Sequence, residues 1–319
     1  MGMTVIEVAD RVRTDGDAYR FMEELRWGDS APKCLHCDSA DTLLITPKNG
    51  VSRTTRRGTQ SERRVWRCRS CRRQFSVLTG TVFHGTKISL RKWVLVIFEM
   101  CASKNGVSAR EIERKYGVCP RTAWFMMHRI RAAMEGPVGD PIMTGVFEAD
   151  ETFFGGADEN KHASKRGGQR GSKGKTPVFT LINRHTGEVR SRVVPNITGR
   201  TLWQVMKEEL DPRFSILNTD GLLSYERIGG RFVEHESVNH DAGEYVRGDV
   251  TINRAENFFS QLKRSIDGTH HHVSREHLDR YLAEFDYRHS TRKMSDMARM
   301  ERLMGQVGGK RLTYKLVKT

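Results

Sequence analysis

Two Cys-x2-Cys knuckles constrain this chain more than any other feature of its sequence. Cys34 and Cys37 form the first knuckle, Cys68 and Cys71 form the second, and 30 residues lie between them. Structural zinc takes four tetrahedral ligands, with thiolates at about 2.3 Å, and each knuckle brings two sulfurs to one ion. Two knuckles complete a site with no open position, which predicts a structural zinc ribbon. The alternative, two redox-active or incidental cysteine pairs, is disfavoured by the paired spacing.

The chain around the knuckles predicts the rest of an N-terminal domain over residues 1–80. Residues 43–67 alternate like two strands around a basic turn, and residues 17–27 predict a short amphipathic helix that packs on them. His36 lies inside the first knuckle and is expected to be a bystander. Cys101 and Cys119 have no partner at ligand spacing and are expected to be buried small hydrophobes.

The chain is strongly basic. Its 319 residues carry 54 Lys and Arg against 39 Asp and Glu, and residues 53–73 alone hold nine Arg and one Glu. Excess positive charge favours polyanions, because counterions are released when phosphates are neutralised. We therefore favour nucleic acid as the partner over a solvated basic surface or an anionic membrane surface.

The apolar segments predict a cytoplasmic protein with no membrane partner. The longest apolar run covers six residues, 93–98, whereas a membrane span needs roughly 18. The first 20 residues contain no apolar core of a secretory signal.

Residues 81–140 have the pattern of a helix-turn-helix domain. Residues 89–103 predict a first helix, and residues 109–116 predict a second that Gly117 ends. Pro120 suits the first turn of a third helix. This layout favours DNA binding, and the alternative is a plain helical bundle.

Basic side chains in both N-terminal domains are candidates for DNA contact. Several residues of the set Arg121, Thr122, His128, Arg129 and Arg131 are expected on the exposed face of the third helix. From this face we select Arg121 and Arg129, and from the second knuckle we select Arg72 and Arg73.

Residues 141–300 predict a mixed sheet with helices, in the layout of a ribonuclease-H-like α/β domain. The expected order is a strand over 144–150, a hairpin over 177–194, a helix over 198–210, a strand over 214–220 and a helix over 253–267. With the zinc ribbon and the helical domain, this makes a multidomain α+β chain. Residues 301–319 are expected to form a basic C-terminal tail.

Carboxylates stand at the ends of both expected single strands. Asp150 ends the first, although Glu148 and Glu151 flank it and the pattern alone does not choose among them; Asp220 ends the second. With Glu256 on the following helix, such acids can converge on two Mg²⁺ ions about 3.5–4 Å apart, as in phosphodiester transfer. Asp150 would bridge both ions, and Asp220 and Glu256 would each hold one. The alternative is that these are ordinary surface acids.

A basic pair follows on the same helix. Lys263 lies two turns after Glu256 on one face and is expected to contact a DNA phosphate, with Arg264 beside it.

From residue 34 to about residue 292 the chain resembles bacterial insertion-sequence transposases with an N-terminal zinc ribbon and a DDE catalytic core, the group numbered fifteen-ninety-five. The matching motifs are CLHC, CRSCRRQFSVLTGTVF, EADETFFGG at 148–156, NTDG at 218–221, VNH at 238–240, NRAENFFSQLKRSIDGTHHHVS at 253–274 and HLDRYLAEFDYRHSTR at 277–292. The 35 residues between Asp220 and Glu256, and the step of seven to Lys263, fit the spacing of that family.

The resemblance implies a DNA transposase. It implies structural zinc, two catalytic Mg²⁺ ions that Mn²⁺ can replace, and terminal inverted repeats in double-stranded DNA as substrate. Strand hydrolysis at each end would free a 3′-hydroxyl that then attacks target DNA. Cutting two ends together implies a homodimer or higher assembly, associated with the bacterial nucleoid.

The resemblance leaves two candidates for the third metal ligand. Related members are described with either Glu or Asn, and this chain has both Glu256 and Asn253. Because Asn supplies only a neutral amide oxygen, we favour Glu256.

Two other functions stay open. A DNA-binding regulator derived from a transposase would have lost an acid or part of the catalytic domain, whereas Asp150, Asp220, Glu256 and Lys263 are all present. A ribonuclease-H-like host nuclease would cut by DNA or RNA structure and not at inverted repeats.

The remaining polar residues near the predicted active face favour structural roles. His235, His240 and the run 270–272 are expected to pack or to cap loops, in preference to contacting DNA or metal. Glu284 and Arg288 lie one turn apart and are expected to form a structural ion pair.

Overall fold

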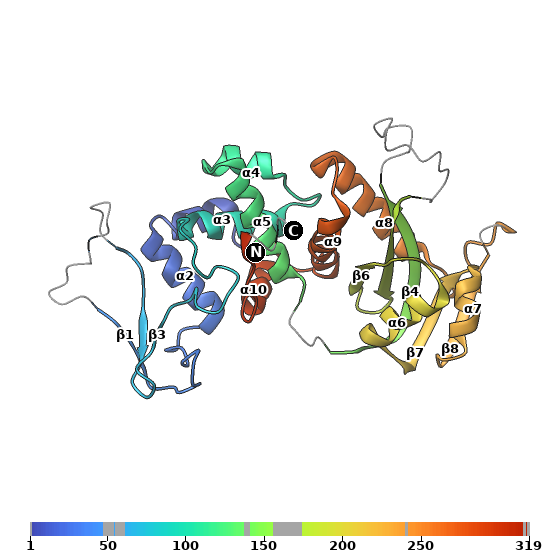
Figure 1. The fold of residues 1–319 in the computed structure, drawn as a ribbon, viewed down its shortest axis with the longest axis horizontal. Helices are drawn as coiled ribbons and strands as arrows, with labels where there is room; N and C mark the ends of the chain where they lie inside the picture. Colours follow the sequence, from blue (N-terminus) through green and yellow to red (C-terminus); the bar gives the residue numbers. More distant parts are fainter. Residues whose placement is uncertain are drawn as a thin grey trace. The chain divides into compact units, whose positions relative to one another are not determined.

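The computed structural model describes residues 2–46, 54, 61–136, 141–155, 174–239, 242–314 and 317 (Figure 1). The chain divides into two compact units. The first unit comprises Met1–Val138 together with Lys293–Thr319, and the second comprises Gly139–Arg292. Within the described residues, no helix has both the length and the apolar character that crossing a bilayer requires.

Helices make up most of the first unit, and side-chain caps set where the first two begin. Thr4 and Thr14 each form a capping box, with Glu7 and Asp17 as the reciprocal acids. The helices of this unit span Val5–Arg11 (α1), Asp15–Trp27 (α2), Leu90–Ala102 (α3), Ala109–Tyr116 (α4), Pro120–Met134 (α5) and Asp296–Gln306 (α10).

The three helices expected between residues 81 and 140 are confirmed as α3, α4 and α5. The Ser108 hydroxyl accepts a hydrogen bond from the backbone N–H of Glu111 at the start of α4. Gly117 ends α4 in a left-handed conformation with a φ of 57°. Pro120 occupies the first turn of α5. The largely buried α3 lies at the centre of the unit, where α1, α2, α5 and α10 all contact it.

A small antiparallel sheet carries the cysteine knuckles. Its strands are β1 (Thr42–Leu44), β2 (Trp66–Cys68) and β3 (Gln74–Phe75), in that order. The two strands expected between the knuckles are thereby confirmed. The basic turn expected between them lies largely outside the described residues.

The C-terminal segment differs from the expected boundary and tail. Residues 293–319 belong to the first unit, and α10 continues past residue 300 to Gln306. The helix buries an apolar stripe of Met297, Met300, Leu303 and Met304. Beyond it, the carbonyl oxygen of Val307 accepts a hydrogen bond from Val82 N at 3.2 Å. This stripe packs on α2, α3 and α5, which lie far away in the sequence.

The second unit is built on a five-stranded mixed sheet of order β6-β5-β4-β7-β8. β4 pairs antiparallel with β5, and β5 pairs antiparallel with β6. On the other side, β7 runs parallel to β4, and β8 runs parallel to β7. The strands span Met143–Phe154 (β4), Thr176–Asn183 (β5), Val189–Val193 (β6), Leu210–Asp220 (β7) and Glu234–Val238 (β8).

Two pairs of helices pack against the sheet (Figure 1). Alternation along β5 sends Phe179 and Leu181 to one face and Val178 and Ile182 to the other. The first pair packs with apolar residues of α6 and α7, and the second packs with those of α8 and α9. These elements span Gly199–Glu209 (α6), Leu223–Gly229 (α7), Asn253–Ser265 (α8), a π-helical turn at Ile266–His270 (η5) and Arg275–Ser290 (α9).

Side chains of α9 cover the free edge of β6. Asp286 accepts hydrogen bonds from the backbone N–H and the hydroxyl of Ser191, both at 2.7 Å. Asp279 accepts from Val193 N at 2.8 Å, and Ser290 accepts from Val189 N at 3.0 Å. Alternate outward N–H groups are therefore satisfied within the chain, which protects an edge that could otherwise pair with another strand.

The ion pair expected on α9 is confirmed. Arg288 Nη1 lies 2.9 Å from Glu284 Oε1, and both side chains are buried. The pair therefore lies inside the packed unit as a structural contact.

The α9 contact predicts a pH-dependent stability. Burial raises the pKa of Asp286 to about 7, so the folded chain holds a proton there that the unfolded chain releases near pH 4. This contribution to stability is complete below about pH 4 and is lost as the pH rises through 7. Asn at this position can accept from Ser191 N and donate to Ser191 Oγ. Asp286→Asn should therefore raise the thermal midpoint relative to wild type by about 2–4 °C at pH 8 and not at pH 4. Scanning calorimetry at both pH values checks this, and an equal shift at both would contradict it.

Candidate metal centre and active site

The four cysteines of the knuckles meet at one point. The Sγ atoms of Cys34 and Cys71 lie 3.6 Å apart, and those of Cys37 and Cys68 lie 3.7 Å apart. All four sulfurs lie within 4.8 Å of one another. A tetrahedral zinc ion with bonds of about 2.3 Å needs sulfurs about 3.8 Å apart. The quartet therefore fits a closed structural zinc site.

Backbone donors and neighbouring side chains hold the knuckles in place. The N–H of Cys71 donates to Cys68 Sγ at 3.4 Å, a contact that favours the thiolate form of Cys68. The hydroxyls of Ser39 and Ser70 join the two knuckles at 2.9 Å. Zinc binding needs thiolates, so a backbone donor to a cysteine sulfur suits the site. His36 is not part of the quartet; its Nε2 lies 3.4 Å from the carbonyl oxygen of Gln74.

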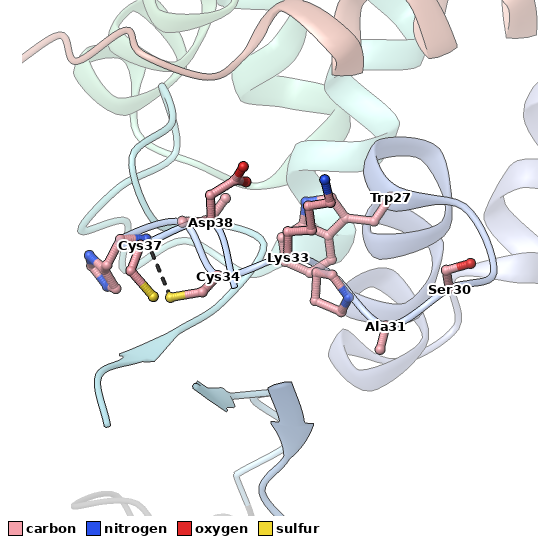
Figure 2. Close-up of a pocket in the computed structure, with 10 residues that line it drawn as sticks. Trp27, Ser30, Ala31, Lys33, Cys34, Cys37 and Asp38 are labelled. Atoms are coloured by element: carbon pink, nitrogen blue, oxygen red, sulfur yellow. Dashed lines mark hydrogen bonds between the residues drawn. The ribbon is translucent and has the colours of Figure 1, made fainter. Parts of the chain in front are cut away.

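The end of α2 packs beside the first knuckle. Figure 2 shows Trp27 and Lys33 lining a groove next to Cys34 and Cys37. On the same helix, Glu23 accepts hydrogen bonds from side chains of the ribbon, Arg64 Nε at 2.7 Å and Trp66 Nε1 at 3.0 Å. The other two sequence cysteines stand apart: Cys101 is buried as expected, but Cys119 is exposed, so the burial predicted for it is wrong.

The strand that carries Asp150 is longer than expected. β4 does not end at Asp150 but continues to Phe154, because its antiparallel ladder with β5 runs on to the pair of Phe154 with Thr176. Asp220 is the last residue of β7, as expected. In the parallel pair, Glu148 lies opposite Asn218, so two residues later Asp150 and Asp220 stand side by side on neighbouring strands.

The structure brings the predicted acids into electrostatic range of one another. Burial raises the pKa of Asp150 to about 7, the negative charges of Asp220 and Glu256 add to the rise, and Lys263 opposes it. Glu256 and Lys263 both come from α8, which packs on β4 and β5. Across the described ranges, however, the cysteine quartet is the one group of three or more His, Cys, Asp or Glu residues whose ligand atoms all lie within 4.8 Å of one another.

Glu148 and Glu151 have different surroundings, although the sequence pattern did not distinguish them from Asp150 as candidate ligands. Glu148 is buried, and its Oε2 accepts hydrogen bonds from the backbone N–H groups of Arg254 and Ala255. Glu151 accepts a hydrogen bond from the hydroxyl of Tyr225, and burial raises the pKa of Glu151 to about 8. Alternation along a strand already separates the two, since Glu148 shares a face with Asp150 and Glu151 does not.

The histidines near this site contact protein groups. His235 Nε2 lies 2.9 Å from the Thr219 hydroxyl, next to Asp220, and burial lowers the pKa of His235. The ring of His270 packs edge-on against Tyr281. These contacts fit the expected structural roles. His240 lies outside the described residues.

The predicted DNA-contact residues divide into exposed and buried sets. The exposed set is Arg72, Arg73, Arg121, Lys263 and Arg264. Arg129 is only 6% exposed, and its guanidinium donates to the carbonyl oxygens of Val82 and His84. The exposed position predicted for Arg129 is therefore wrong; His128 and Arg131 of the same set are also buried. The physical reason is that α3 and α10 both pack against α5. Their contacts bury more than one face of α5.

Comparisons with known proteins place two family descriptions on this chain. A model described as ISXO2-like transposase domain, of the IS1595 group, matches residues 142–290, and one described as transposase zinc-ribbon domain matches residues 13–74. The chain is 29% identical over 231 residues to a protein of Halobacterium salinarum described as an uncharacterized protein in transposable element ISH50, covering 69% of this chain and 76% of that one.

One solved structure is similar at a low level. It is a chain of the cryo-EM structure of the simian T-cell lymphotropic virus intasome in complex with PP2A regulatory subunit B56 gamma, with 11% identity and a TM-score of 0.29. The match covers 55% of this chain and 63% of that chain, less than two thirds of its length.

The cysteine geometry predicts the effect of losing one sulfur. Cys68→Ser should lower the zinc content from one ion per chain to well below half, and it should destabilise the first unit, because zinc binding contributes folding free energy. Elemental analysis and thermal unfolding measure both. Cys119→Ser is the matched control, since Cys119 lies outside the quartet. Full zinc retention by Cys68→Ser would contradict the four-thiolate site.

Proposed function

This chain belongs to the insertion-sequence transposases of the IS1595 group, and from that membership we propose that it cuts and joins DNA strands at the ends of its element. It binds the terminal inverted repeats, hydrolyses one strand at each end to free a 3′-hydroxyl, and directs that hydroxyl to target DNA. The observation that supports the proposal most is the parallel register of β4 with β7, which brings Asp150 beside Asp220, together with the packing of α8, the helix of Glu256 and Lys263, on β4 inside the transposase segment.

The catalytic unit is proposed to be ribonuclease-H-like. Its first three strands form an antiparallel meander, and the next two add in parallel on the other side of the first, with helices against both faces. This topology places the first and fourth strands side by side at the centre, where Asp150 and Asp220 lie.

Asp150, Asp220 and Glu256 are proposed to hold two Mg²⁺ ions, which Mn²⁺ can replace. Carboxylate oxygens are the ligands that these hard cations prefer, and bringing positive charge to three neighbouring acids relieves the repulsion that helps to raise the pKa of Asp150. When bound, the ions supply activation of the attacking oxygen and stabilisation of the leaving one. Asp150 neighbours Asp220 in the β4–β7 pair, and the charge of Glu256 acts on it, so Asp150 would be the ligand that both ions share.

Glu256 is favoured over Asn253 as the third ligand. The charge of Glu256 acts on Asp150, whereas Asn253 is the first residue of α8 and lies nearly one turn before it. A carboxylate also contributes the negative charge that a divalent cation requires and that an amide lacks.

DNA contact is proposed to involve the exposed basic residues of both units. Arg72 and Arg73 belong to the second knuckle, Arg121 to the start of α5, and Lys263 and Arg264 to α8. The pair α4–α5, joined by the Gly117 turn, is proposed as a helix-turn-helix. Arg129 is not proposed as a DNA contact, because its guanidinium donates to backbone carbonyl oxygens inside the protein. Cutting two ends together calls for a homodimer or higher assembly.

The catalytic assignment predicts loss of strand cutting without loss of DNA binding. With Mg²⁺, Asp150→Asn, Asp220→Asn and Glu256→Gln should each reduce nicking of a labelled duplex carrying the element's ends by about 100-fold or more, since even residues behind metal ligands contribute 10- to 100-fold. Asn253→Ala is the matched control on α8 and should cut at nearly the wild-type rate.

Three results of that experiment would contradict the assignment. Wild-type activity of Glu256→Gln together with an inactive Asn253→Ala would assign the third ligand to Asn253. Specific binding without nicking by the wild-type chain would favour a regulator. Cutting that ignores the repeats would favour a host nuclease.

The proposed DNA contact at α5 predicts a change in salt dependence. Arg121→Ala should weaken binding and reduce the slope of log K against log salt concentration by about 1, because one phosphate contact is lost. Arg213→Ala is the control; Arg213 is exposed near the start of β7, at the opposite end of the strand from Asp220. Fluorescence anisotropy over a salt series measures both, and an unchanged slope for Arg121→Ala would remove it from the interface.

A further inference from the structure

Glu148 is a fully buried carboxylate next to the proposed metal ligands. It lies on β4 two residues before Asp150 and on the same face of the sheet, with 0% of its surface exposed. An ionised carboxylate is costly to bury unless charged partners and hydrogen bonds compensate it. The contacts of Glu148 supply this compensation.

One oxygen of Glu148 caps α8 from outside that helix. Oε2 accepts hydrogen bonds from Arg254 N at 2.8 Å and from Ala255 N at 3.2 Å. These are the second and third residues of α8, whose N–H groups a helix leaves unpaired and an N-cap side chain usually satisfies. Ile252, at the N-cap position, makes no such bond. A strand residue thus supplies the cap that the local sequence lacks.

The other oxygen of Glu148 faces an arginine that ties the same region together. Arg184 Nε lies 3.3 Å from Glu148 Oε1, and another nitrogen of Arg184 donates to the carbonyl oxygen of Asp249, shortly before α8. In return, Arg254 in the first turn of α8 donates to the carbonyl oxygen of Arg184. The start of α8 is therefore held from β4 and from the turn after β5.

We propose that Glu148 is a positioning residue that fixes the helix of the third metal ligand against the strand of the first. Glu256 directly follows Ala255, whose N–H bonds the Glu148 carboxylate. Asp150 lies two residues after Glu148 on β4. The same carboxylate therefore holds the backbone next to both proposed ligands. The proposal rests on the proposed function, in which Asp150 and Glu256 share the metal site.

The test compares Glu148→Ala and Glu148→Gln with Glu209→Gln in the zinc-loaded full chain. Glu209 is likewise a buried carboxylate paired with arginines, Arg190 at 3.0 Å and Arg192 at 2.8 Å, but it lies at the end of α6. Glu148→Ala should raise the Mg²⁺ concentration for half-maximal nicking about 10- to 100-fold, with a smaller loss of rate at saturating Mg²⁺. Glu148→Gln keeps an acceptor oxygen for the amides but loses the ion pair, so its shift should be intermediate.

Two outcomes would overturn the positioning role. One is an unchanged Mg²⁺ requirement in Glu148→Ala, and the other is an equal shift in Glu209→Gln, which would indicate general destabilisation. Calorimetric titration with Mn²⁺ compares the same variants without measuring activity. If the wild-type chain binds Mn²⁺ but cuts no DNA, the proposed function is refuted, and the titration still tests the positioning role of Glu148.

Amide hydrogen exchange in the wild-type chain gives a measurement that needs no variant. The N–H groups of Arg254 and Ala255 should be protected, although the first turn of a helix normally exchanges fast. Fast exchange of both N–H groups would overturn the positioning role of Glu148 even if the Glu148 variants did not fold.

Discussion

The parallel pairing of β4 with β7 is the contact on which the candidate active site depends. It places Glu148 opposite Asn218, and so Asp150 beside Asp220. The register is held from the other face of the sheet, where Phe147 of β4 packs with α6 and α7 in one buried cluster. A slip of one residue would move Phe147 to the face of α8 and α9 and would turn Asp150 into the apolar cluster with α6 and α7. Packing on one face thereby fixes chemistry on the other.

That arrangement carries an electrostatic cost that the fold must offset. Burial and two neighbouring carboxylates raise the pKa of Asp150 to about 7, which shows how poorly the folded chain tolerates its negative charge. Lys263 opposes the rise from α8, and large apolar clusters on both faces of the sheet stabilise the unit. A site that is strained by like charges is one that gains most from a divalent cation. The zinc ribbon differs, because its quartet is closed and its geometry already matches the ion.

The features predicted correctly from sequence are those set by neighbours along the chain. The cysteine knuckles predict zinc through their ligand type and spacing. Ser108 and Gly117 mark the start and end of α4, and Pro120 marks the start of α5, through local backbone chemistry. The errors arose where distant segments decide. β4 runs past its acid because β5 continues the ladder, and Arg129 is buried in a unit that α10 completes from the end of the chain. The capping role of Glu148 also needed coordinates, since its partners lie more than a hundred residues away.

The most direct test of the account is to locate the cations. Crystals of the zinc-loaded full chain soaked in Mn²⁺ allow anomalous scattering to separate manganese from zinc. We predict two manganese ions about 3.5–4 Å apart, both bound by Asp150, one also by Asp220 and the other by Glu256. Manganese bound elsewhere, or bound at Asp150 with Asn253 in place of Glu256, would contradict it.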